Sequence, residues 1–261
     1  MTTNRFQGKV ALVTGGSRGI GRAICKKLAE GGAHVAVNYS SAADAKFPGA
    51  PEEALELARS YGVNGMLVEA DVSDSAAVRR MVDSTIERLG PIDILVNNAG
   101  ICPMVEFFDL TEEIWDRVHA VNLKSVFLCT QAVAKTMVDR KAGGRIICIS
   151  SIASIIGTPT QIHYCPTKSG INMFVKSLAA VLTPLGITVN AVLPGDIATD
   201  ISREWDEANP EEIQRYINRC PARRRGQPED IAAVVAFLAS DEASFVSGSL
   251  YLADGGISAV M

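Results

Sequence analysis

The chain has 261 residues, of which 48% are hydrophobic and 21% charged, and its formal net charge is −4. This length suits one domain with a full core, and this balance of apolar and charged residues excludes an intrinsically disordered chain. The longest basic run is Arg223-Arg224-Arg225, so the charge pattern also argues against a nucleic-acid binder.

Neither a targeting segment nor a metal site is evident in the sequence. The first residues lack the apolar core of a signal peptide, and no stretch of about 18 apolar residues occurs, so we expect a cytoplasmic protein without membrane contacts. The six cysteines and three histidines are dispersed and form no Cys-x-x-Cys pair. We therefore expect buried thiols rather than a disulfide framework or a metal centre.

Short apolar runs alternate with amphipathic segments, which is typical of a parallel sheet covered on both faces by helices. The predicted strands are 10–14, 34–38, 65–70, 92–97, 144–150, 188–193 and 249–253. The predicted helices are 20–30, 51–61, 75–89, 111–139, 164–185 and 228–239. Each connection is long enough for a right-handed crossover. The sequence thus predicts one α/β domain over residues 1–261, built on a doubly wound parallel sheet of seven strands.

The first predicted strand runs directly into the turn Thr14-Gly15-Gly16-Ser17-Arg18-Gly19-Ile20-Gly21, which opens a helix. In this context glycines let the backbone approach a pyrophosphate, and the helix N-terminus offers free N–H groups and partial positive charge. The spacing departs from the usual Gly-x-Gly-x-x-Gly. The turn alone therefore does not separate a dinucleotide site from a tight structural turn.

The end of the second strand bears on the choice of dinucleotide. Enzymes that use NAD normally place an acid there, to bind the ribose hydroxyls, but this chain has Asn38 and no carboxylate before Asp44. Arg18 is suited to pair with a 2′-phosphate, helped by Asn38 and by Ser40 or Ser41. These residues favour NADP(H), with NAD(H) as the alternative, and predict that Asn38→Asp shifts preference toward NAD⁺. The competing interpretations are a surface Arg18 and a turn residue at Asn38.

Residues 40–51 carry Pro48, Gly49 and Pro51 and are predicted as a loop. This loop is either a surface connection or a cover folded over a bound nucleotide. The second long irregular segment, residues 196–227, mixes acids, arginines and two prolines with a weak helical period at 211–217. We expect a mobile substrate lid there.

Two further strand ends supply candidate ligand contacts, because open α/β sheets bind ligands at the carboxyl ends of their strands. Asp71 and Val72 end the third strand, and Asn97-Asn98-Ala99-Gly100 ends the fourth. Asp71 is placed to accept the adenine amino group, or alternatively to cap the next helix. The Asn97–Gly100 turn is expected under the adenosine ribose.

The strongest chemical signal is Ser151 followed by Tyr164-Cys165-Pro166-Thr167-Lys168. Tyr164 and Lys168 are four residues apart, so both lie on one face of a helix, and Pro166 is compatible with its first turn. An adjacent ammonium favours a phenolate, which would bring Tyr164 into the range of a general acid or base. Ser151 would hold the substrate oxygen in line with the phenol, and Asn122 would anchor a water chain to Lys168.

Taken together, these motifs and Pro194-Gly195 resemble the short-chain dehydrogenase/reductase family over essentially the whole chain. The resemblance implies a Rossmann-type fold, an NAD(P)-dependent oxidoreductase acting on CH–OH groups, a catalytic set of Asn122, Ser151, Tyr164 and Lys168, and a homotetramer. It also implies that Thr199 contacts the nicotinamide amide. The expected cofactor contacts are Gly15, Ser17, Arg18, Gly19, Ile20, Gly21, Asn38, Ser40, Asp71, Val72, Asn98, Ala99, Gly100, Tyr164, Lys168, Pro194, Gly195, Ile197 and Thr199.

Within that family, the segments 97–103, 163–168 and 193–201 are similar to NAD(P)-dependent aldose 1-dehydrogenases, particularly those acting on L-rhamnose. The resemblance implies oxidation at C1 to a lactone, with substrate contacts at Met104, Ser151, Ala153, Gln161 and Tyr164. Met104 and Ala153 depart from the pattern of that branch. A carbonyl reductase of the 3-oxoacyl-thioester type therefore remains the alternative. A nucleotide-sensing protein without activity would predict a damaged catalytic set, which is intact here.

Overall fold

The seven predicted strands form one parallel sheet in the computed structural model, which describes residues 4–200 and 203–260. The strands are β1 (Val10–Val13), β2 (His34–Tyr39), β3 (Gly65–Glu69), β4 (Ile94–Asn97), β5 (Gly144–Ile149), β6 (Ile187–Pro194) and β7 (Leu250–Ala253). Their order is β3-β2-β1-β4-β5-β6-β7, and all neighbours are parallel. The predicted doubly wound sheet is confirmed.

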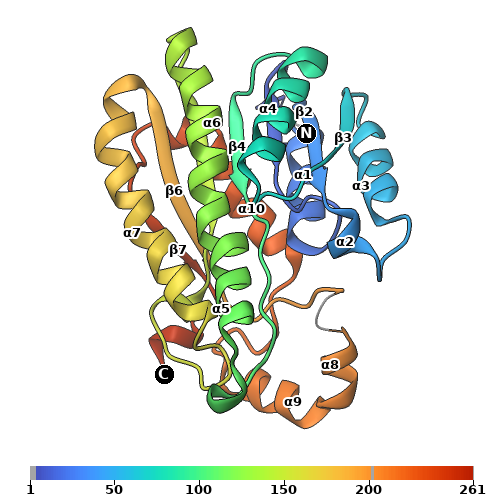
Figure 1. The fold of residues 1–261 in the computed structure, drawn as a ribbon, viewed down its shortest axis with the longest axis vertical. Helices are drawn as coiled ribbons and strands as arrows, with labels where there is room; N and C mark the ends of the chain where they lie inside the picture. The colour runs from blue at the N-terminus through green and yellow to red at the C-terminus, as the bar shows by residue number, and fades with distance from the viewer. Residues whose placement is uncertain (1–3, 201–202, 261) are drawn as a thin grey trace.

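Helices cover both faces of this sheet (Figure 1). One layer contains α1 (Gly19–Glu30), α3 (Ala50–Arg59) and α10 (Pro228–Ala239), and the other contains α4 (Ser75–Leu89), α6 (Ser125–Arg140) and α7 (Tyr164–Leu182). Successive strand residues point to opposite faces, so Leu12 packs in one core layer and Val13 in the other. Strands buried on both faces must be apolar throughout, which explains runs such as Val10–Val13.

The helix predicted over residues 111–139 is interrupted in the structure. α5 (Glu112–His119) is capped by the Thr111 hydroxyl, which accepts from Ile114 N at 3.3 Å. A π-helical turn (Ala120–Lys124) then separates it from α6. The predicted helix is thus helical throughout residues 112–140, but it contains a π turn that local periodicity did not predict. π turns of this kind often lie at functional sites, and this one holds Asn122.

Both segments predicted as irregular contain short helices. Residues 40–51 include α2 (Ser41–Asp44), and residues 196–227 include α8 (Arg203–Ala208) and α9 (Pro210–Arg219). In Figure 1, α8 and α9 lie beyond the carboxyl end of β6. Ile201 and Ser202, which belong to the predicted lid, lie outside the described residues. The mobility of the lid stays a prediction.

The reversal of strand order positions the site. β1 and β4 are neighbours, but the chain leaves β1 toward β2 and leaves β4 toward β5. Their following loops therefore diverge and leave a crevice at the carboxyl ends of the strands. Within the described part of the chain, no helix is both long and apolar enough to cross a membrane.

Candidate active site

The glycine turn after β1 has a backbone that side chains would not fit. Gly15 and Gly19 have φ angles of +60° and +52°, in the left-handed region that favours glycine. A Cβ at Gly21 would lie 2.0 Å from Gly15 O and 2.7 Å from Asn98 Nδ2. This close packing brings the start of α1 to the end of β1, as a pyrophosphate cradle requires.

The turn after β4 is tied to the glycine turn. Asn98 Nδ2 donates to Thr14 O at 3.0 Å and to Gly15 O at 2.9 Å. The backbone N–H groups of Asn98 and Ala99 both donate to the Thr14 hydroxyl, at 2.9 and 3.1 Å. The two strand ends that the sequence analysis assigned to the dinucleotide therefore form one rigid unit.

The side chain of Asn38 holds the glycine turn by a hydrogen bond. Its side chain is 2% exposed, and its Oδ1 accepts from Gly15 N at 3.1 Å. Its Nδ2 donates to the carbonyls of Tyr39, Val68 and Ala70, each at 3.2 Å. Every polar atom of the amide is thus used within the protein. This corrects the predicted contact with a 2′-phosphate: β2 continues to Tyr39, and Asn38 points toward the neighbouring backbone.

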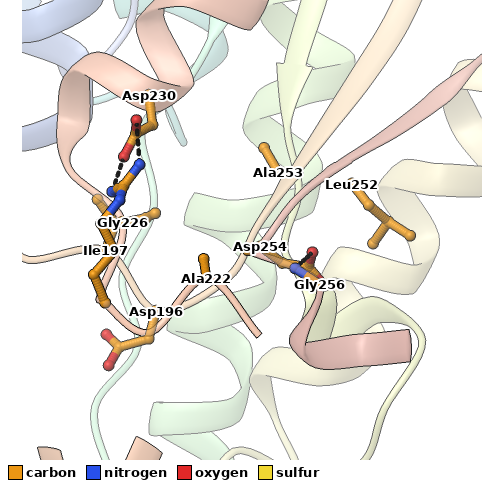
Figure 2. Close-up of a pocket in the computed structure, with 11 residues that line it drawn as sticks. Asp196, Ile197, Ala222, Gly226, Asp230, Leu252, Ala253, Asp254 and Gly256 are labelled. Carbon is orange, nitrogen blue, oxygen red and sulfur yellow. Dashed lines mark hydrogen bonds and ion pairs between the residues drawn. The ribbon is translucent and has the colours of Figure 1, made fainter. Parts of the chain in front are cut away.

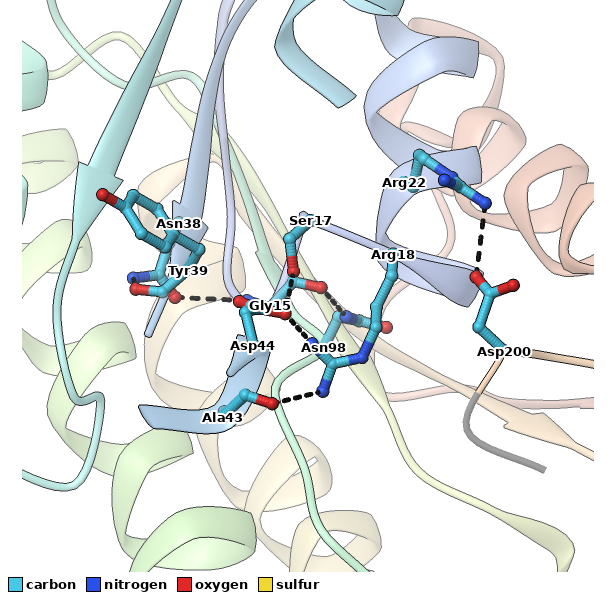
Figure 3. Close-up of polar contacts among 10 residues, drawn as sticks. All are labelled: Gly15, Ser17, Arg18, Arg22, Asn38, Tyr39, Ala43, Asp44, Asn98 and Asp200. Carbon is cyan, nitrogen blue, oxygen red and sulfur yellow. Dashed lines mark hydrogen bonds and ion pairs between the residues drawn. The ribbon is translucent and has the colours of Figure 1, made fainter. Parts of the chain in front are cut away.

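Arg18 is held by residues of the loop predicted at 40–51 (Figure 3). Its Nη2 donates to Ala43 O at 3.3 Å, its Nη1 forms an ion pair with Asp44, and its guanidinium lies 4.6 Å from the centre of the Phe47 ring. The side chain is 16% exposed, so the surface interpretation of Arg18 does not hold. Burial lowers the pKa of Arg18, opposed by the charge of Asp200.

Asp44 is the residue at this end that the sequence analysis missed. Its carboxylate accepts from the Ser17 hydroxyl at 2.9 Å and is 7% exposed. Ser40, predicted to contact the cofactor, accepts from Asp44 N through its backbone carbonyl at 2.9 Å. The loop therefore folds against the glycine turn, and the only sequence signal for this contact was an acid within that loop.

Asp71 provides an anionic acceptor at the carboxyl end of β3. Its Oδ1 accepts from Ser73 N and Ser73 Oγ at 2.9 and 2.7 Å, and its Oδ2 pairs with Arg117 at 3.1 Å. Burial alone would raise the pKa of Asp71, but these hydrogen bonds and the charge of Arg117 hold it below its usual value. The helix cap is Asp74, which accepts from Ala76 N at 2.8 Å, so the capping alternative for Asp71 is wrong. Val72 is buried beside it.

The predicted catalytic residues meet at the carboxyl end of β5. Tyr164 opens α7, and Lys168 lies one turn later. Ser151 follows β5 and lies close enough to the Tyr164 side chain to lower its pKa. Lys168 is 4% exposed, and its Nζ donates to Ile149 O at 2.9 Å. That Nζ lies 5.3 Å from the centre of the Tyr164 ring. The predicted spacing of tyrosine and lysine on one helix face is confirmed.

Burial is the larger influence on both titrating groups. It raises the pKa of Tyr164 by more than the hydrogen bond from Ser151 lowers it. It also lowers the pKa of Lys168 to about 8. We expected the lysine to lower the pKa of the tyrosine, but burial raises it. Burial thus disfavours the charged forms of both Tyr164 and Lys168.

Asn122 clamps the backbone opposite Lys168. Its Oδ1 accepts from Ile101 N, and its Nδ2 donates to Ile101 O, both at 2.8 Å. A Cβ on Gly100 would lie 3.4 Å from Asn122 Oδ1 and 3.7 Å from Lys168 Nζ. The amide is committed to Ile101, so it positions the turn after β4. This differs from its predicted use as an anchor for a water chain.

The predicted substrate residues lie on two adjacent segments beside Tyr164. Met104 is 56% exposed, and its sulfur lies 3.7 Å from Gln161 Nε2. Gln161 Oε1 accepts from the Thr158 hydroxyl at 2.7 Å, and its backbone carbonyl accepts from Tyr164 N at 2.9 Å. Ala153 is buried and donates its N–H to Ser151 Oγ at 3.1 Å. Met104 thus contacts Gln161, and Gln161 contacts Tyr164 through its backbone; their role in binding substrate stays a prediction.

Cys102 also belongs to this site, although the sequence analysis treated every cysteine as a buried thiol. Cys102 and Cys165 are partly exposed, whereas the other four cysteines are buried. Cys102 interacts with Gln161, Lys168 and Cys165, and burial raises its pKa to about 12. The sequence signal that could have placed Cys102 at this site is its position two residues after the Asn97–Gly100 turn.

The segment after β6 crosses the glycine turn. A Cβ on Gly19 would lie 3.5 Å from Thr199 Cγ2. Ile197 is buried and forms an isolated bridge with Gly226, which joins the two ends of the predicted lid. Arg225 pairs with Asp196 at 2.8 Å and with Asp206 at 2.5 Å. Thr199 therefore lies beside the glycine turn, whereas Gly195 lies against β7 and Ile197 at the base of the lid. The contacts of Pro194, Gly195, Ile197 and Thr199 with a cofactor stay predictions.

A separate pocket of about 290 Å³ lies at the carboxyl ends of β6 and β7. Figure 2 shows it between the segment at Asp196 and Ile197 and the segment at Asp254 and Gly256. The four predicted catalytic residues do not line it. Although acids line this pocket, no group of three or more potential His, Cys, Asp or Glu ligands gathers anywhere in residues 4–200 and 203–260.

Known proteins resemble the chain over nearly its full length. A family model described as enoyl-(acyl carrier protein) reductase matches residues 15–258. The L-rhamnose 1-dehydrogenase (NADP(+)) of Thermoplasma acidophilum is 43% identical over 97% of both chains. The L-rhamnose 1-dehydrogenase (NAD(P)(+)) of Azotobacter vinelandii is 41% identical over 95% of this chain and 96% of its own. The 3-oxoacyl-[acyl-carrier-protein] reductase FabG of Staphylococcus aureus is 40% identical over 95% of this chain and 98% of its own.

Solved structures agree with this relationship. The crystal structure of a short-chain type dehydrogenase/reductase from Mycobacterium marinum is 33% identical, covers 97% of both chains and has a TM-score of 0.89. The glycine turn, the tyrosine and lysine on α7 and these similarities lead to one conclusion. The chain belongs to the short-chain dehydrogenase/reductase family, whose members are NAD(P)-dependent oxidoreductases acting on CH–OH groups.

Proposed function

We propose that the protein oxidises an aldose such as L-rhamnose at C1 to the lactone. The carrying observation is that Tyr164 lies beside Lys168 on one helix face, with Ser151 near its side chain and with Tyr164 N hydrogen-bonded to the Gln161 carbonyl. Two hydroxyls would position the reacting oxygen, and the Gln161 amide would exchange its contacts with Thr158 and Met104 for the other hydroxyls of a sugar. The identities with two L-rhamnose 1-dehydrogenases, 43% and 41%, support this choice.

The residues divide the reaction into two transfers from the sugar. When bound in the crevice, NADP⁺ would supply the acceptor for the hydride that leaves C1. The proton of the C1 hydroxyl passes to Tyr164 Oη as the phenol gives its own proton to the neutral amine of Lys168. Ser151 holds the substrate oxygen by a hydrogen bond, and the C1–O bond becomes the lactone carbonyl. Lys168, with a pKa lowered to about 8, exchanges the proton onward. Asn122 keeps the turn at Gly100 and Ile101 against the lysine.

The crevice at β1 and β4 fits a dinucleotide. The cradle of Gly15, Gly19 and Gly21 leaves no space for a Cβ at Gly21, and the α1 N-terminus supplies N–H groups to a pyrophosphate. Asp71 would accept the adenine amino group, and Thr199 would contact the nicotinamide amide. We propose a preference for NADP(H), because Arg18 is a cation at the ribose end and the second strand ends without an acid.

Residues 196–227 are proposed as the lid over this site. The Ile197–Gly226 bridge and the Arg225 ion pairs form a fixed base, beyond which α8 and α9 project. A lid hinged at such a base closes over the sugar and excludes water from the reacting atoms.

We also propose a homotetramer in the cytoplasm. α6 and α7 expose Phe127, Met173 and Val181, and the edge strand β7 exposes Leu252. Two separate apolar surfaces suit a tetramer with two kinds of twofold interface. Light scattering coupled to gel filtration measures the mass directly, and a monomeric mass would refute the assembly. The location rests on the sequence prediction alone.

The test of the activity is a pair of initial-rate assays followed by reduced-nicotinamide absorbance. One assay uses L-rhamnose and other aldoses with NADP⁺ or NAD⁺, and the other uses a 3-oxoacyl thioester with NADPH. We expect sugar-dependent cofactor reduction and lactone as the product. Oxidation of NADPH by the thioester alone would instead establish the carbonyl reductase that the 40% identity with FabG favours.

A further inference from the structure

A carboxylate of the protein itself occupies the groups that a 2′-phosphate would use. Asp44 Oδ1 accepts from the Ser17 hydroxyl at 2.9 Å and also pairs with Arg18 Nη1. The other terminal nitrogen, Nη2, donates to Ala43 O at 3.3 Å. Both terminal nitrogens of Arg18 are therefore engaged by consecutive residues of the loop that follows β2 (Figure 3).

This contact is buried, which matters for what it can do. Asp44 is 7% exposed and Ser17 is 2% exposed. An acid that binds ribose hydroxyls must present its oxygens to the ligand, whereas the Asp44 carboxylate faces a serine and an arginine inside the fold. Its geometry is that of an anion bound by the protein. A carboxylate and a phosphate oxygen are alternative acceptors for the same guanidinium.

The segment that carries Asp44 is suited to move. α2 has only four residues, and its backbone hydrogen bonds include those from Asp44 N to Ser40 O at 2.9 Å and from Phe47 N to Asp44 O at 2.7 Å. Phe47 lies over the Arg18 guanidinium, a contact that the arginine can keep when its anionic partner changes. The second acid nearby, Asp200, is engaged by Arg22 at 3.3 Å and Arg203 at 2.9 Å.

We propose that Asp44 is a resident anion in the 2′-phosphate site: NADP displaces it from Arg18 and Ser17, whereas NAD leaves it in place. The inference rests on the proposed position of the adenosine ribose at Arg18. It makes Asp44 a specificity-determining residue. The 2′-phosphate must compete with an internal carboxylate for Arg18, so the chain discriminates between the two dinucleotides less than its arginine alone would allow.

The test measures nucleotide binding without nicotinamide or sugar, so its result does not depend on the oxidation of an aldose. The ligands are 2′,5′-ADP and 5′-ADP, titrated calorimetrically into the full-length protein. In Asp44→Asn the amide still accepts from Ser17, but its charge no longer holds Arg18. We expect 2′,5′-ADP to bind about tenfold more tightly than in wild type, as the loss of one competing charged hydrogen bond implies. Binding of 5′-ADP should be unchanged.

The matched control is Asp241→Asn. Asp241 also pairs with an arginine, Arg145, at 3.1 Å, but it lies near the start of β5, away from the crevice. This variant should leave both affinities unchanged, which separates release of Arg18 from a general change of net charge. A gain of 2′,5′-ADP affinity in both variants would overturn the proposal, as would an unchanged affinity in Asp44→Asn. A loss of 5′-ADP affinity in Asp44→Asn would identify Asp44 as a ribose acceptor and also overturn it.

A second measurement uses wild-type protein and decides the matter even if Asp44→Asn fails to fold. Hydrogen exchange is followed at the amides of Asp44 and Phe47, with each nucleotide at saturation. We expect 2′,5′-ADP to accelerate exchange of both amides and 5′-ADP to leave them as in the free protein. Equal exchange with the two nucleotides would refute displacement. If 2′,5′-ADP binds no more tightly than 5′-ADP even in Asp44→Asn, the proposed NADP preference fails as well.

Discussion

The two ends of the active-site crevice are built in different ways. At the chemical end, Tyr164 and Lys168 share one turn of α7, and Ser151 follows the adjacent strand. At the dinucleotide end, the glycine turn is held by side chains distant in sequence. Gly15 forms hydrogen bonds with the side chains of Asn38 and Asn98, which are 23 and 83 residues away in the sequence. Ser17 forms one with Asp44, which is 27 residues away.

The difference also concerns how polar groups are satisfied. At the dinucleotide end, every polar atom of the Asn38 amide is hydrogen-bonded within the protein, so the turn at Gly15 tolerates little change, whereas Asp44 is the partner there that we propose can be exchanged. At the chemical end, burial shifts the pKa of Tyr164 upward and that of Lys168 downward to about 8. That end keeps reactive groups in an environment that disfavours their charged forms, which suits proton transfer.

Removing the phenol should have the largest effect and should spare the dinucleotide end. Tyr164→Phe deletes the hydroxyl that exchanges the substrate proton, so we expect turnover with L-rhamnose to fall by roughly 10³-fold. Binding of NADP⁺, followed by quenching of protein fluorescence, should persist within about twofold, since the cradle around Gly15 is untouched. Tyr61→Phe, at an exposed tyrosine beyond α3, is the control. Turnover that survives in Tyr164→Phe would disprove the role of the tyrosine.

A change at Asn38 should damage stability rather than switch the cofactor. In Asn38→Asp the second carboxylate oxygen would face the carbonyls of Tyr39, Val68 and Ala70, which are all acceptors. We expect the free energy of unfolding to fall by about 3 kcal/mol, measured by guanidinium denaturation. Asn64→Asp, at an exposed asparagine, should cost little. A stable Asn38→Asp protein with NAD⁺ preference would restore the interpretation from sequence.

The smallest expected effect is a pH dependence of stability that belongs to Lys168. Its pKa is lowered from 10.5 to about 8 in the folded protein, so between these values the unfolded chain binds more protons than the folded one. The free energy of unfolding should therefore rise with pH from about 8 to 10.5, by at most roughly 3 kcal/mol. Lys168→Met should lack this rise, when Tm is recorded across that range.

Lys176→Met provides the matched control for this slope. Lys176 lies on the same helix but is exposed, so the variant should keep the rise seen in wild type. An identical pH dependence in wild type and Lys168→Met would show that the buried lysine is not the titrating group. The lowered pKa that we assign to Lys168 would then be wrong.

The sequence by itself determined the sheet of this protein and the common helix face of Tyr164 and Lys168, its proposed reacting residues. Apolar runs must be strands buried on both faces, and their bounds were predicted within two residues. The four-residue spacing of Tyr164 and Lys168 fixes their common face because helix geometry is local. The strand ends at Ser151 and Asn97–Gly100 follow from the same pattern, since parallel strands bring their carboxyl ends to one edge.

Only the tertiary structure decided what surrounds these residues. Asn122, in the π turn, hydrogen-bonds the backbone of Ile101, and the amide of Asn38 donates to backbone carbonyls of Tyr39, Val68 and Ala70. Asp44 reaches Ser17 across a loop without periodicity. Each of these contacts joins segments that are far apart in the chain, and its strength depends on burial, a property of the packed fold that no local pattern of residues contains.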